Sequence, residues 1–150
     1  MSISEDMKRV IRQRAQRGAL NSSVYRDLSI VSCEVSEKST RMVISLPVID
    51  QYVDHEGLIS DAAMSHVMDT LPGIFEMAIG RRNVVVVRLN INTIGRARVG
   101  DNICIQMDFE RIEKGEFGKV EFEVRNKGEL MAKGSLTIKF INLLWAEAKI

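Results

Sequence analysis

Apolar and polar residues alternate through much of the chain, which is the period of a β-strand with one buried face. Two such segments, residues 28–35 and 42–46, are joined by a polar link at 37–40 and predict a hairpin. Four more segments follow further along the chain, at residues 84–94, 103–109, 120–124 and 136–140. Turn-forming residues at 99–101, 114–118 and 126–128 separate these segments. The second half of the chain is therefore predicted to form a four-stranded β-meander.

Four consecutive valines, residues 84–87, interrupt the alternation at the start of the third segment. An unbroken apolar run is typical of a strand that is covered on both faces. We therefore expect residues 84–87 to form an inner strand of the sheet.

Between the two groups of strands, residues 59–79 have the spacing of an amphipathic helix. One apolar stripe at i, i+3 and i+4 spacing is formed by Ala63, Met64, Val67, Met68 and Leu71. Ser60 or Asp61 is suited to cap the start of this helix, and Pro72-Gly73 is expected to kink or break it. One long helix beside six antiparallel strands predicts an α+β fold, with the helix packed across the concave face of the sheet.

A second amphipathic segment opens the chain. Ser2 or Ser4 is suited to cap a helix that Gly18 ends, with apolar residues on one stripe and basic residues on the other faces. Those basic faces are either solvated or in contact with a phosphate or a partner. We expect residues 1–20 to be an N-terminal amphipathic helix and residues 21–150 to be a single domain, because no repeat or linker divides them.

Composition mainly excludes classes of protein. The 150 residues contain 21 Lys and Arg against 20 Asp and Glu, and only 5% are aromatic. This balance argues against nucleic acid as a partner, and no segment reaches the roughly 18 apolar residues of a membrane span. The two histidines lack the spacing of a metal site, and Cys33 and Cys104 are expected to be small buried residues in a reducing compartment. The N-terminus lacks a secretory apolar core, so we expect a cytoplasmic or mitochondrial protein that is not secreted.

Asp69 is the residue of the central helix that departs from the apolar pattern. It lies three residues after His66 and four after Ser65, so the three share one helical face. Asp69 is therefore part of a solvated face, or a local partner of His66, or a base or nucleophile that points into a cleft. The start of the same helix offers free backbone N–H groups, which suit a developing oxyanion.

The segment 54–69 resembles a known motif. Hotdog-fold acyl-CoA thioesterases of the phenylacetate-pathway and small mitochondrial type carry Asn-x-x-Gly-x-x-His-Gly-Gly, followed by an Asp further along the helix. This chain has Asp54, Gly57 and Ser60-Asp61-Ala62 in register with the motif, and Asp69 at the family's spacing. Residues 87–92, 97–101 and 130–137 are similar to the family's later strand and turn signatures, so the resemblance covers roughly residues 28–141.

The resemblance implies a hotdog fold, a long central helix wrapped by a six-stranded antiparallel sheet, and it implies roles for individual residues. Asp69 would be the general base or nucleophile, and the backbone N–H of Asp61 would bind the oxyanion. Asp54 and Gly57 would form the loop before them. The implied surface for coenzyme A comprises Asn90, Thr93, Gly95, Arg96, Arg98, Lys114 and Ser135. Coenzyme A would enter as part of the substrate, so neither a cofactor nor a metal is expected.

The implied activity is hydrolysis of an acyl-CoA to a free fatty or aryl acid and coenzyme A, at sites shared by two subunits of a homodimer or homotetramer. Met64, Met68 and Phe75 would line the tunnel for the acyl chain. Because the family's His-Gly-Gly is replaced by Ser60-Asp61-Ala62, two alternatives stay open. One is a non-catalytic hotdog module that binds acyl-CoA, and the other is a structural subunit.

Overall fold

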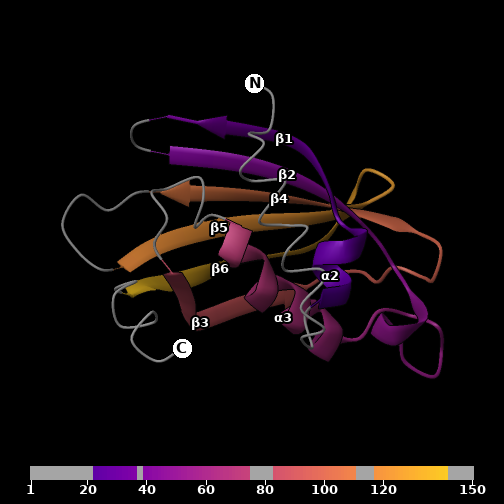
Figure 1. Cartoon of the computed structure of the whole chain (residues 1–150). Helices are drawn as coiled ribbons and strands as arrows, with labels where there is room; N and C mark the ends of the chain where they lie inside the picture. The colour runs from indigo at the N-terminus through magenta and orange to yellow at the C-terminus, as the bar shows by residue number, and fades with distance from the viewer. Residues whose placement is uncertain (1–21, 37–38, 75–82, 111–116, 142–150) are drawn as a thin grey trace.

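The computed structural model describes residues 22–36, 39–74, 83–110 and 117–141 (Figure 1). Its elements are α2 (Ser22–Asp27), β1 (Ser29–Val35), β2 (Ser39–Pro47), the 3₁₀ helix η1 (Asp50–Tyr52), α3 (Asp61–Thr70), the 3₁₀ helix η2 (Leu71–Ile74), β3 (Asn83–Thr93), β4 (Asn102–Glu110), β5 (Phe117–Asn126) and β6 (Glu129–Ile141). All six predicted strands are present, whereas α2 and η1 were not predicted. The N-terminal helix expected at residues 1–20, together with Phe75 and Lys114, lies outside the described residues.

The six strands form one antiparallel sheet in the order β1-β2-β4-β5-β6-β3. The predicted hairpin of β1 and β2 is confirmed, and β4, β5 and β6 are consecutive neighbours. The four-stranded meander is wrong for β3, which pairs with β6 at the far edge of the sheet. The connection from β3 to β4, residues 94–101, is longer than the two to five residues that close a hairpin, so β3 and β4 need not be neighbours.

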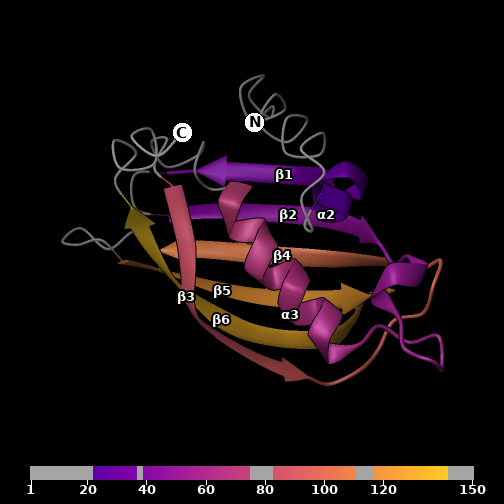
Figure 2. The same cartoon turned by 60° about the horizontal axis from the view of Figure 1, so that its bottom comes forward.

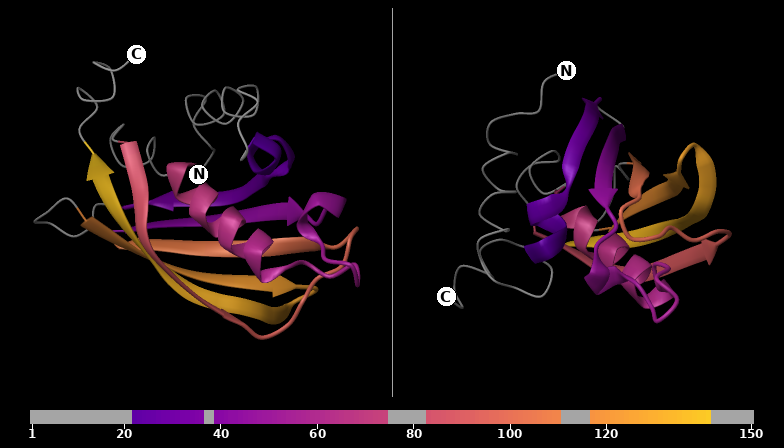
Figure 3. Two further views of the ribbon diagram at one scale, coloured as in Figure 1. Left: turned by 90° about the horizontal axis from the view of Figure 1, so that it is seen from below. Right: turned by 90° about the vertical axis from the view of Figure 1, so that its right-hand side faces the viewer.

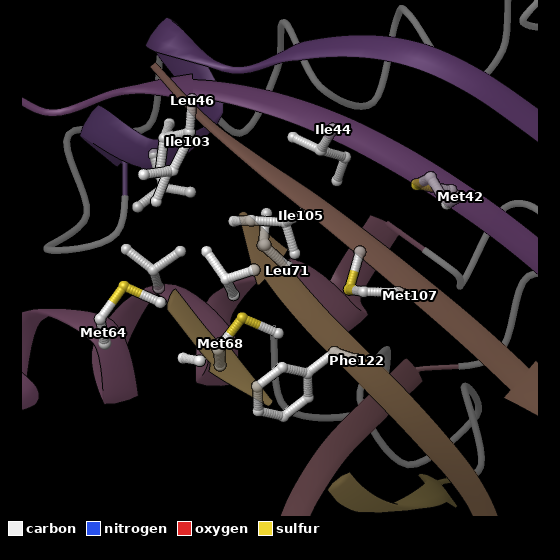
Figure 4. Packing of buried hydrophobic residues seen from close by; sticks show 14 of the residues in the cluster. Met42, Ile44, Leu46, Met64, Met68, Leu71, Ile103, Ile105, Met107 and Phe122 are labelled. Atoms are coloured by element: carbon white, nitrogen blue, oxygen red, sulfur yellow. The ribbon is translucent and has the colours of Figure 1, made fainter. Parts of the chain in front are cut away.

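Helix α3 crosses one face of this sheet (Figure 2). Seen from below, the sheet curves around the helix, as the α+β expectation required (left view in Figure 3). Alternate residues of the inner strands point toward α3 and are at most 3% exposed, among them Ile44, Ile105, Met107, Phe122 and Val124. Met64 and Met68 of α3 meet these strands in a single apolar core (Figure 4). Each side chain of this size contributes about 1.5–3 kcal/mol when it is fully buried.

Helix α3 begins at Asp61, two residues later than predicted. Ile59 is still part of an isolated β-bridge with Val53, and Ser60 has the extended backbone of an N-cap. At the other end, α3 tightens into η2 at residues 71–74, so the break predicted at Pro72-Gly73 is confirmed. Proline removes a backbone donor, and it thereby ends the regular α-helical ladder.

Strand β3 differs from the expectation that residues 84–87 are buried on both faces. Val85 and Val87 are 40% and 52% exposed, because β3 is an edge strand with β6 as its neighbour. A β-bulge between Val86 and Arg88 leaves Val87 without a partner on β6. The four consecutive valines therefore lie on one of the two edge strands of the sheet, not on an inner strand.

Strands β3 and β6 approach each other closely at Gly134. A Cβ atom at this position would overlap the backbone carbonyl oxygen of Asn90 and would lie 2.7 Å from Cζ of Phe122. Only glycine fits there without moving the edge strand.

Two further expectations concern single features. Cys33 is buried as predicted, but Cys104 is exposed, because it lies on the face of β4 that points away from the helix. Within residues 22–74 and 83–141, apart from the gaps named above, no helix is long and apolar enough to cross a membrane.

Candidate active site

The loop before α3 is organised by Asp54. Its Oδ1 accepts hydrogen bonds from the backbone N–H of Glu56 at 2.8 Å and of Leu58 at 3.2 Å. These two bonds hold the pKa of the Asp54 carboxyl below its usual value of 3.8, because they stabilise the ionised form. Gly57 completes the turn with a φ of +76°, a conformation that favours glycine. Asp54 and Gly57 thus shape the approach to the helix, and both acceptor bonds of Asp54 serve the loop.

The residues that enter α3 are fixed from several sides. Ile59 N–H donates to the carbonyl oxygen of Ala97 at 2.8 Å, and Ser60 N–H donates to that of Tyr52 at 2.9 Å. The hydroxyl oxygen of Ser60 accepts from Ala63 N–H at 3.0 Å, which caps the helix. The start of the helix is therefore held by backbone bonds to two other segments of the chain.

Two backbone donors remain open at this point. In the described part of the chain, nothing accepts a hydrogen bond from the N–H of Asp61 or of Ala62. The first N–H groups of a helix have no intrahelical acceptor and carry the positive end of the helix dipole. Such a pair of donors is suited to hold a negatively charged oxygen. The N–H of Ala62 is a second donor that the sequence analysis did not name. A cap at Ser60 predicts it, because Ser60 satisfies the N–H of Ala63 and leaves that of Ala62 open.

The side chain of Asp61 turns toward the end of β3. It accepts a hydrogen bond from Oγ1 of Thr93 at 3.2 Å, and it pairs with Nη2 of Arg96 at 3.4 Å. Nη1 of Arg96 donates to the carbonyl oxygen of Ile59 at 3.0 Å. Gly95 lies beside this cluster, and its N–H donates to the carbonyl oxygen of Met131 at 2.9 Å. The structure thus brings together four of the predicted site residues, Asp61, Thr93, Gly95 and Arg96.

Asp69 lies at the other end of α3 and is exposed. Among the residues described, its carboxylate has neither a hydrogen-bond partner nor an ion-pair partner, so the pairing with His66 does not occur there. Asp69 follows Asp61 by eight residues, which is about 12 Å along a helix axis. One carbonyl group cannot touch the N–H of Asp61 and the carboxylate of Asp69 in the same chain.

The remaining predicted residues are dispersed. Arg98 is exposed, its backbone N–H donates to Oδ2 of Asp101 at 2.9 Å, and it forms a β-bridge with Leu58 beside the helix start. Asn90 and Ser135 are paired across β3 and β6 on the outer face of the sheet. There Asn90 borders a polar hollow of about 500 Å³ that is lined by residues of β3, β4, β5 and β6. The structure does not bring Asn90 and Ser135 into contact with the cluster at Asp61.

Three solved structures are similar to the chain over most of its length. The zebra fish thioesterase superfamily member 2 has a TM-score of 0.75 at 18% identity, over 94% of this chain and 100% of that one. The Escherichia coli PaaI protein of the phenylacetic acid degradation operon has a TM-score of 0.69 at 14% identity, over 94% and 97% of the two chains. The smu.793 protein of Streptococcus mutans, solved bound to acetyl CoA, has a TM-score of 0.66 at 18% identity, over 77% and 90%.

These likenesses define the class of fold. All three have the hotdog fold, so the chain has the hotdog fold that the family resemblance implied. No protein-family model and no curated protein sequence matches the chain.

Proposed function

We propose that this chain is an acyl-CoA thioesterase, which hydrolyses an acyl-CoA to a carboxylic acid and coenzyme A. The observation that carries the proposal is the pair of open N–H groups at Asp61 and Ala62, at the hydrogen-bonded start of α3. The hotdog fold supports it, as does the acetyl CoA bound in the similar Streptococcus mutans protein.

In the proposed reaction, Asp69 accepts a proton from a water molecule while the water oxygen attacks the thioester carbonyl carbon. The carbonyl electrons move onto oxygen, where the N–H groups of Asp61 and Ala62 stabilise the negative charge; one such donor contributes about 2.7–4 kcal/mol in comparable sites. When the carbonyl re-forms, the carbon–sulfur bond breaks. The departing thiolate takes the proton held by Asp69, and the products are a carboxylic acid and a thiol.

Two copies of the chain are required for this chemistry, because Asp69 lies about 12 Å from the Asp61 donor within one helix. Strand β3 offers the means of association: it is an 11-residue edge strand with exposed Val85 and Val87. Unpaired strand edges pair readily with a second copy, and two-fold pairing would complete two equivalent sites. In this proposal Asp69 of one copy acts on a carbonyl held by the helix start of the other.

The direct test is release of free thiol from short, medium and long acyl-CoAs by the purified chain. Hydrolysis that is lost in Asp69→Ala supports the proposal, and unchanged turnover in that variant overturns the role of Asp69.

Asp61 favours one second candidate, a hotdog module that binds acyl-CoA without hydrolysing it. A carboxylate stands here where the resembling family has glycine, and its charge opposes a developing oxyanion. Calorimetry with coenzyme A separates the possibilities. Binding without thiol release would identify a binding module, whereas neither binding nor release would leave a structural subunit.

A further inference from the structure

The carboxylate of Asp61 presents an electrostatic problem for the proposed site. It belongs to the residue whose own N–H is to hold a negative oxygen, and its side chain is 64% exposed. An unneutralised negative charge at this position would weaken the donor, because both charges would have the same sign within a few ångströms. An active site of this kind therefore needs a cation that compensates Asp61.

Arg96 is the cation that meets this need in the structure. Its Nη2 lies 3.4 Å from the Asp61 carboxylate, and its Nη1 donates to the carbonyl oxygen of Ile59 at 3.0 Å. The two contacts join the residues immediately before and at the helix start. The planar guanidinium fork is suited to hold two acceptors at once, which lysine cannot reproduce.

We propose that Arg96 is a positioning residue of the active site: it neutralises Asp61 and fixes the helix start that carries the oxyanion donors. This inference rests on the proposed thioesterase function and differs from the expectation that Arg96 binds a phosphate of coenzyme A. The reason is that each terminal nitrogen already donates one of its N–H groups, Nη1 to Ile59 and Nη2 to Asp61, so the fork faces the start of α3. Thr93 supports the same arrangement, since its hydroxyl directs the Asp61 carboxylate toward β3.

The test combines a double-mutant cycle with two substrates. Arg96→Met is compared with wild type, and the same change is made in the Asp61→Asn background, where no charge needs neutralising. Each protein is assayed with an acyl-CoA and with the matching acyl-pantetheine thioester, which lacks the nucleotide phosphates. We expect Arg96→Met to lower kcat about tenfold with both substrates while KM changes little. In the Asp61→Asn background, where only the bond to Ile59 is lost, we expect it to lower kcat about two- to threefold.

Arg125→Met is the matched control. Arg125 also contacts one carboxylate, Glu123 at 3.3 Å, and one carbonyl oxygen, that of Gly128 at 3.2 Å, but it lies on the exposed face of β5, opposite the face that packs on α3. We expect wild-type kinetics from it. A loss in Arg96→Met that is confined to acyl-CoA and appears in KM would overturn the proposal and make Arg96 a phosphate ligand. An equal loss in the Asp61→Asn background would also overturn it.

The same cycle has a readout that does not need catalysis. Acetate is titrated into each protein, and the backbone amide resonances of Asp61 and Ala62 are followed by NMR. We expect acetate to shift both resonances in wild type and to bind several-fold more weakly to Arg96→Met. In the double variant we expect its affinity to return toward the wild-type value. Equal acetate affinity in wild type and Arg96→Met would overturn the inference. If the wild-type chain hydrolyses no thioester, the proposed function fails, and the titration still decides the role of Arg96.

Discussion

The two ends of helix α3 are built in opposite ways. At the first end, the start of the helix is held by the cap of Ser60, by the bond from Arg96 to Ile59, and by backbone bonds to two other segments of the chain. Near the last turn, Asp69 is exposed and has no partner among the residues that the structure describes. The difference shows that contacts within one chain hold the start of α3 in place but leave Asp69 without a partner. In the proposed function, the start of α3 would hold the oxyanion, and Asp69 of a second copy would activate the water molecule.

The largest effect is expected when Asp69, in the last turn of α3, is altered. Asp69→Asn removes the proton acceptor but preserves the shape of the side chain. We expect kcat for acyl-CoA hydrolysis to fall about 10²- to 10⁴-fold, the usual contribution of a general base. Thiol release measured with excess substrate checks this value.

The control for Asp69→Asn is its assembly. Since Asp69 is exposed and bonds to nothing in the described part of the chain, sedimentation equilibrium should give the same mass for variant and wild type. A variant that retains full activity would show that Asp69 is only part of a solvated face of the helix.

A mixed dimer tests whether the two ends work across copies. Asp61→Pro removes the N–H donor at the first helical position, where proline is well tolerated, and Asp61→Ala controls for the lost side chain. Asp61→Pro and Asp69→Asn should each be inactive alone. Co-expressed with different affinity tags and purified through both tags, the mixed dimers should recover about half of the wild-type rate, because each has one intact site out of two.

The mixed dimer gives an answer in either direction. Recovery shows that Asp69 and the helix start come from different chains. If the purified mixed dimers are as inactive as their parents, the two groups act within one chain or do not act together, and the proposed geometry is wrong.

A smaller effect, on stability, is expected at the start of α3. Ser60→Ala removes the acceptor for Ala63 N–H and should cost about 1 kcal/mol of unfolding free energy, measured by urea denaturation. Ser60→Asn retains a capping side chain and should restore most of that loss. An Ala variant as stable as wild type would mean that the other bonds suffice to hold the helix start.

The sequence predicted the start of α3 better than the contacts that hold it in place. Glycine at 57 and a capping residue at 60 are local signals, so the loop and the helix start could be placed within two residues. The contacts of Arg96 with Ile59 and Asp61 join positions 37 and 35 residues apart, and no local pattern encodes them. For the same physical reason, alternation assigned faces within β4, β5 and β6 but could not tell that β3, with its four consecutive valines, pairs with β6 at an edge.

The smallest effect concerns how the stability contributed by the loop before α3 depends on pH. Two backbone N–H groups lower the pKa of Asp54, so its ionised form stabilises the folded state above the unfolded value of 3.8. That contribution is lost as the pH falls through the lower folded pKa. In Asp54→Asn the amide oxygen still accepts both bonds, but without a charge and with no titration. We therefore expect the variant to unfold at slightly lower urea concentration than wild type at pH 7, and the gap to narrow as the pH falls below 3.8.

Asp50→Asn is the matched control for this last comparison. Asp50 is an exposed carboxylate four residues earlier, and its side chain has no hydrogen bond within the described segments. Its substitution should leave the urea midpoint nearly unchanged both at pH 7 and at acid pH. Asp101 also has a lowered pKa, through the N–H of Arg98 and the amide of Asn126, so part of the acid sensitivity must survive in Asp54→Asn. A gap between Asp54→Asn and wild type that stays constant down to pH 3 would show that the Asp54 charge does not stabilise the loop. Its backbone acceptors would then act through geometry alone.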